Sequence, residues 1–160
     1  FKNADHIASG DDMLLMHKIK MKHPFLIGYL FSSKAIVTTA PMPDWKSFLN
    51  QRIRWASKAT SYKDKKVFWV LLLVYFTNLF LFALFIACFF YPKVFLVWLL
   101  LMLTKALFEM PFMYRVSQFF SLQKLMFWFV LMQPFHILYT IVSGWLGIFG
   151  TYKWKGRKVK

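Results

Sequence analysis

The sequence predicts an α-helical membrane region with about three transmembrane helices, and three observations lead to this fold class. Of its 160 residues, 59% are hydrophobic and 21% are aromatic, well above the usual share in soluble proteins. Uncharged apolar runs are long enough to cross the hydrocarbon core of a bilayer. The formal net charge is +15, and the basic residues gather beside these runs. This pattern favours contact with anionic membrane lipids and argues against a nucleic-acid partner.

The polar N-terminal part begins with a predicted helix over residues 11–22. The dipeptide His23-Pro24 ends it, because proline disfavours helical geometry in the residue before it. Two stretches rich in β-branched and aromatic residues, 25–29 and 34–39, predict short strands.

A second helix is predicted from about Trp45 to Ala59, with Asp44 as its N-terminal cap. Residues 60–66 follow as a polar, lysine-rich hinge at the membrane surface. Arg52 and Lys58 are interpreted as solvated or lipid-facing cations.

Three apolar segments are predicted to cross the membrane, at about residues 67–91, 94–113 and 125–149. A polar linker over 114–124 separates the second from the third. Pro134 is expected to bend the third segment, because a proline inside a helix removes a backbone hydrogen bond.

Two charged residues lie inside the second apolar segment. Lys105 and Glu109 are one helical turn apart, and we expect them to pair with each other and to face other helices. The single cysteine, Cys88, excludes an intrachain disulfide. The basic and aromatic tail, 153–160, is suited to the lipid headgroup layer.

The side of the membrane follows from the cations. Lysine and arginine are dense in residues 46–66, so the positive-inside rule places residues 1–66 in the cytoplasm. Three crossings then put the tail on the outer side, against the same rule. We predict three crossings, with the tail outside.

The helix over 45–59 carries a group of side chains suited to sugar chemistry. Gln51, Arg54 and Trp55 are spaced i, i+3 and i+4, so they share one helical face. An amide and a forked guanidinium can bind a diphosphate, and an indole ring can stack against a sugar. Upstream, Asp12 is suited to act as a general base. The plainer alternatives are a membrane-surface anchor for Trp55 and a helix-dipole partner for Asp12.

Gln51-x-x-Arg54-Trp55 resembles the QxxRW motif of membrane-bound family 2 glycosyltransferases, such as cellulose and hyaluronan synthases. Gly10-Asp11-Asp12 stands where that family carries Thr-Glu-Asp, so Asp12 matches its catalytic aspartate. Gly-Asp replaces Thr-Glu, and Asp11 either assists at the site or only caps the helix. The motifs cover roughly residues 7–66, and the remainder is similar only in architecture.

The resemblance implies the C-terminal end of a GT-A α/β glycosyltransferase domain over residues 1–66, followed by the membrane helices of 67–152 and the tail of 153–160. It implies a nucleotide-sugar donor, a glycan or lipid acceptor, and a divalent cation, Mg or Mn, held by a DxD motif. No DxD occurs in the sequence, and no metal site is predicted within it. Because Phe1 lies so close to the acidic motif, we expect a C-terminal fragment of a longer protein, inactive alone.

By this resemblance the chain is an inverting hexosyltransferase of polysaccharide biosynthesis in a bacterial inner membrane. Asp12 would be the catalytic base, with Gln51, Arg54 and Trp55 binding acceptor and diphosphate. The alternative from another class is a small membrane protein without enzymatic activity, serving as an anchor or a transport-assembly subunit.

Overall fold

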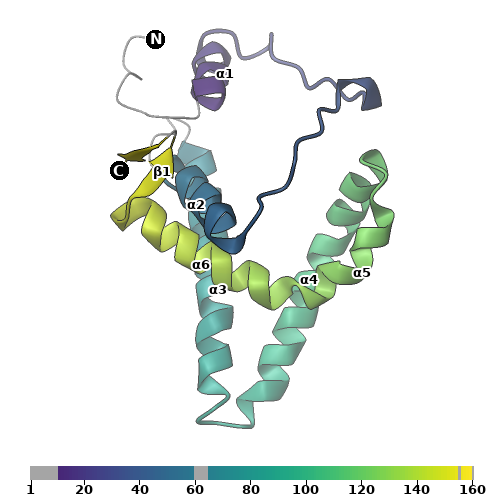
Figure 1. Cartoon of the computed structure of the whole chain (residues 1–160). Helices are drawn as coiled ribbons and strands as arrows, with labels where there is room; N and C mark the ends of the chain where they lie inside the picture. The colour runs from purple at the N-terminus through teal and green to yellow at the C-terminus, as the bar shows by residue number, and fades with distance from the viewer. Residues whose placement is uncertain (1–10, 60–64, 155, 160) are drawn as a thin grey trace. The chain divides into compact units, whose positions relative to one another are not determined.

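The computed structural model describes residues 11–59, 65–154 and 156–159, and the described chain is mainly helical (Figure 1). In chain order the elements are α1 (Asp11–Lys22), η1 (Ser33–Ala35), α2 (Trp45–Ala56), α3 (Lys65–Ala87), α4 (Val94–Phe119), η3 (Gln123–Leu125), α5 (Met126–Leu131), α6 (Gln133–Phe149), β1 (Tyr152–Trp154) and β2 (Arg157–Val159). They form two compact units, one of residues 1–30, 39–75 and 142–160, the other of 31–38 and 76–141.

Two predicted helices are present. Helix α1 ends at Lys22, directly before His23-Pro24, as the sequence predicts. Helix α2 begins at Trp45 after the Asp44 cap, and it ends at Ala56, three residues earlier than predicted. Of the predicted hinge over 60–66, residues 60–64 lie outside the described part, and Lys65 begins α3.

The two predicted strands, 25–29 and 34–39, are wrong. The first stretch is turn and irregular chain, and the second begins with the end of η1, whose N-terminal cap is Ser32, and continues as irregular chain. Strand propensity expresses how well a side chain packs in a half-buried sheet, and a lone hairpin is marginal in water. Here the side chains are open, with Phe25 96% and Val37 84% exposed. Without a packed neighbour, the β-branched and aromatic residues do not form a sheet.

The sheet that the described residues contain is small. Strands β1 and β2 pair antiparallel, with Tyr152 opposite Val159 and Trp154 opposite Arg157. Gly156, in the turn, has a φ of 77°, which favours glycine. A GT-A α/β domain is therefore not seen in the described part of the chain.

Two helices are long and apolar enough to cross a membrane. Helix α3 has 23 residues and α4 has 26, so each exceeds the roughly 20 residues that span a bilayer. The predicted boundary at Met113 is wrong, because α4 continues to Phe119, halfway into the expected polar linker. Pro111 lies inside this helix.

The third apolar segment is not one helix. The piece Gln123–Leu131 and helix α6 are bent by 73° at Met132. Pro134 lies in the first turn of α6, where its missing N–H leaves no helical hydrogen bond unmade. A bend in this segment is confirmed, but it lies at Met132 and not at Pro134, and it fits either a broken crossing or a re-entrant loop.

A polar cluster joins α6 to α4 within the second unit. The Lys105 ammonium lies 2.8 Å from the Glu109 carboxylate and donates to the Gln133 side-chain oxygen at 2.7 Å. The Gln133 amide in turn donates to Glu109 at 2.9 Å, and Gln133 is buried. The expected pairing of Lys105 with Glu109 is confirmed, with Gln133 as a third member.

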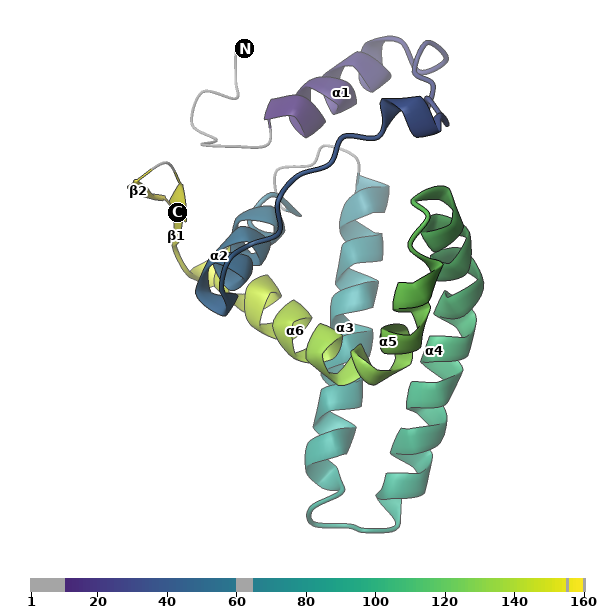
Figure 2. The ribbon, with the colours of Figure 1, turned by 45° about the vertical axis from the view of Figure 1, so that its right-hand side comes forward.

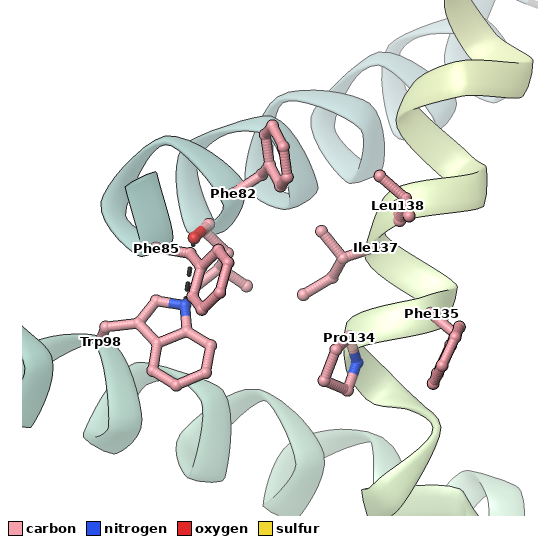
Figure 3. Close-up of a pocket in the computed structure, with 8 residues that line it drawn as sticks. Phe82, Phe85, Trp98, Pro134, Phe135, Ile137 and Leu138 are labelled. Atoms are coloured by element: carbon pink, nitrogen blue, oxygen red, sulfur yellow. Dashed lines mark hydrogen bonds between the residues drawn. The ribbon is translucent and has the colours of Figure 1, made fainter. Parts of the chain in front are cut away.

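The same unit has an apolar core of Leu81, Met102 and Ile137. Beside it lies a cavity of about 340 Å³, shown in Figure 3. Its lining comes from α3, α4 and α6 and is apolar. The lining residues are Leu81, Phe82, Phe85, Trp98, Pro134, Phe135, Ile137 and Leu138. The Trp98 indole N–H donates to the Leu81 carbonyl at 3.2 Å, which fixes one wall. This cavity suits hydrocarbon and offers no group for polar chemistry.

Candidate functional site

The candidate site is built on α2, whose start is set by a side-chain cap. The Asp44 carboxylate accepts from the Ser47 backbone N–H at 2.8 Å and from the Ser47 hydroxyl at 3.0 Å. These bonds, that of the backbone N–H first, hold the pKa of Asp44 below its usual range. Ile53 is the buried residue of α2, and the helical spacing places Gln51, Arg54 and Trp55 on the side of the helix away from it. The helix therefore presents Gln51, Arg54 and Trp55 from one ordered scaffold.

Arg54 is half-buried against the C-terminal hairpin. Its guanidinium carbon lies 4.1 Å from the centroid of the Trp154 ring, within the range of a cation–π contact. A guanidinium stacked by its face still carries its N–H donors in its own plane. Arg54 is thereby held in place while its fork can bind an anion.

Trp55 belongs to a second cluster on the same helix. The Arg52 guanidinium lies 4.6 Å from the centroid of the Trp55 ring and 4.8 Å from that of Phe48. Arg52 is half-buried beside these two rings. The Trp55 side chain is 50% exposed, so part of its ring surface is accessible to a sugar.

The C-terminal hairpin is fastened to α2 by hydrogen bonds. The Asn50 amide donates to the Lys153 carbonyl, its oxygen accepts from the Lys153 N–H, and both distances are 2.8 Å. Figures 1 and 2 both show β1 beside α2. β1 thus contacts α2 directly, whereas the sequence prediction places the tail across the membrane from residues 1–66.

Lys58 makes a further polar contact with the hairpin. Its side chain is 7% exposed, and the ammonium donates to the Tyr152 hydroxyl at 3.3 Å. The interpretation of Lys58 as a solvated or lipid-facing cation is therefore wrong. Tyr152 is itself buried, so the pair forms part of the packing between β1 and the turn that follows α2.

Helix α6 approaches the end of α2 through a glycine. A Cβ built on Gly147 would lie 2.7 Å from the Ala56 Cβ and 2.9 Å from the Ser57 backbone nitrogen. Only a residue without a side chain allows this approach of the two backbones. The end of α6 and the hairpin that follows it thus both rest on α2.

The acidic residues lie on a different helix. Asp12 is exposed in the first turn of α1, and Asp11 begins that helix. No hydrogen bond or ion pair among the described residues links Asp12 with Gln51, Arg54 or Trp55. The structure brings the three α2 residues together on one helix and leaves Asp12 apart from them.

The cation that the resemblance implies does not fit the residues present. In residues 11–59, 65–154 and 156–159, no three histidine, cysteine, aspartate or glutamate side chains are grouped to hold a metal ion.

Comparison of the chain with protein-family models, curated proteins and solved structures finds no match. A function for this chain consequently rests on its motifs and on the geometry of α2.

Sequence reasoning missed the hairpin residues at the site. Tyr152 and Trp154 of the hairpin reach Lys58 and Arg54, and Asn50 of α2 binds Lys153, through contacts about a hundred residues apart in the chain. A signal was present: strand-forming residues, Tyr152 and Trp154 before Gly156 and Val159 after it, stand among cations, which is typical of a hairpin.

Proposed function

We propose that this chain carries the acceptor side of an inverting, nucleotide-sugar-dependent glycosyltransferase at the cytoplasmic face of a membrane. The observation that carries the proposal is the arrangement on α2, where a capped helix presents Gln51, a stacked Arg54 and a half-exposed Trp55. A diphosphate-binding fork beside a sugar-stacking ring is what glycosyl transfer needs at the reacting centre.

The reaction is a single displacement. The acceptor hydroxyl oxygen attacks the anomeric carbon, the bond from that carbon to the diphosphate oxygen breaks, and the nucleoside diphosphate leaves with the electron pair. Asp12 of α1, which must approach the α2 residues when substrates are bound, takes the proton of the hydroxyl as the bond forms. The sugar is transferred with inversion at the anomeric carbon.

Gln51 and Arg54 stabilise the charge that develops on the departing diphosphate, with the fixed fork of Arg54 contributing most. A hydrogen-bond donor group that is already oriented loses little entropy at the transition state. The contact with Trp154 orients the Arg54 guanidinium in this way. Trp55 supports the acceptor ring, and Arg52 holds its indole. The acceptor is a glycan or a lipid-linked sugar at the membrane surface.

The membrane helices support this assignment in a general way. Helices α3 and α4 are long and apolar enough to hold the site at a bilayer. Lys46, Lys65 and Lys66 lie on α2 and at the start of α3, where they attract anionic headgroups.

The experiment is sugar transfer by membranes that contain the full-length protein, with a panel of radiolabelled UDP- and GDP-sugars. Asp12→Asn should lower incorporation by about a hundredfold to ten-thousandfold, the usual contribution of a general base. Asp44→Asn serves as the matched control, since it removes a carboxylate and keeps a good helix cap. Incorporation by Asp12→Asn at a rate close to that of the control would refute the assignment of Asp12.

A further inference from the structure

The contact between the C-terminal hairpin and α2 restricts how the chain can cross a membrane. Asn50 binds the backbone of Lys153 through two hydrogen bonds of 2.8 Å, and Lys58 binds Tyr152. Groups joined in this way lie on the same side of a bilayer, whose hydrocarbon core is about 30 Å thick. The chain between α2 and β1 therefore crosses the membrane an even number of times.

Helices α3 and α4 account for two crossings. A third crossing by the bent segment 123–149 would make the number odd. We propose that η3, α5 and α6 form a re-entrant segment, which enters the membrane and returns to the side it came from. The segment thereby places the C-terminal hairpin against α2, where Trp154 contacts Arg54 of the candidate site.

The dimensions of the segment agree with this. Helix α6 has 17 residues, so it is about 26 Å long at about 1.5 Å per residue. That is shorter than a hydrocarbon core of about 30 Å. The bend of 73° turns the piece before α6 well away from its axis, as expected where a segment reverses.

The positions of the basic residues also agree with a re-entrant segment. With a re-entrant segment, the basic residues of α2, Arg115 near the end of α4, Lys124 of η3 and the basic residues of the tail all share one side. The turn between α3 and α4 carries Lys93 as its only charged residue. This distribution satisfies the positive-inside rule, which three crossings would violate at the tail.

The polar cluster explains how a broken helix is tolerated inside the membrane. A break in a helix leaves backbone N–H and C=O groups without helical hydrogen bonds. Within the hydrocarbon core, such non-helical chain is stable only where it is buried in protein. Gln133, the first residue of α6, is 3% exposed and is held by both Lys105 and Glu109 of α4. The cluster thereby anchors the reversal to a neighbouring helix.

Thiol labelling in intact cells tests the proposal. In a Cys88→Ser background, single cysteines are introduced by Lys46→Cys on α2, Lys93→Cys in the turn after α3, and Lys158→Cys in the hairpin, all at exposed positions. An impermeant maleimide is applied before and after lysis. The first two variants define the two sides.

We expect Lys158→Cys to label together with Lys46→Cys, only after lysis, while Lys93→Cys labels in intact cells. Labelling of Lys158→Cys in the same condition as Lys93→Cys would overturn the re-entrant segment. The result does not depend on sugar transfer, so a chain without transferase activity would still give a decisive answer on topology.

Discussion

At the scale of single residues, two arginines on one helix have different surroundings. Arg52 lies between Phe48 and Trp55 of its own helix, which are local neighbours at i−4 and i+3. Arg54 instead stacks on Trp154, a hundred residues away. The motif arginine is therefore the one whose position depends on the tertiary structure.

This dependence leads to a prediction for Trp154. A cation–π contact at a partly exposed site is worth about 0.5–1 kcal/mol, which corresponds to about a two- to fivefold change in rate or affinity. Trp154→Leu should lower kcat/KM for the nucleotide sugar by about this factor, because Arg54 loses its stacking partner. Trp154→Tyr, which keeps an aromatic face, should restore most of the loss. Steady-state kinetics with the two variants would contradict a positioning role if tyrosine and leucine had equal effects.

At the scale of elements, the contact between α6 and α2 depends on Gly147. Glycine to alanine in a helix interior normally stabilises by about 1 kcal/mol. Here the new methyl group would meet Ala56 and the Ser57 backbone at less than 3 Å, so the helices must separate.

We predict that Gly147→Ala lowers the free energy of unfolding by about 1–3 kcal/mol, the usual effect of overpacking. Gly28→Ala is the matched control, because a methyl group there meets no atom within 4 Å. Thermal unfolding in detergent measures both variants. An unchanged melting temperature for Gly147→Ala would mean that α6 does not rest on α2.

The elements also differ in how far the sequence alone could predict them. Helix α2 and its Asp44 cap follow from local signals, and α3 and α4 follow from apolar length. Residues 25–29 carry strand-forming side chains, but whether a strand forms depends on a partner strand, which local signals do not report. The hairpin on α2 depends in the same way on contacts distant in sequence, such as Asn50 with Lys153.

For the whole chain, the order of the elements relates the membrane helices to the candidate site. Two helices able to cross the membrane lie between α2 and the segment that returns the hairpin to it. We propose that α2 carries a glycosyl-transfer site, and Arg54 is its most specific part.

The most direct measurement compares sugar transfer by Arg54→Ala, Arg54→Lys and Lys46→Ala in membranes, at equal protein levels. Loss of a donor that stabilises developing charge lowers rates by about a hundredfold to a thousandfold, and we predict this for Arg54→Ala. Arg54→Lys keeps the charge without the fork and should be intermediate. Lys46→Ala, an exposed cation of the same helix, should retain the wild-type rate. Transfer by Arg54→Ala at the rate of Lys46→Ala would contradict a transfer site on α2.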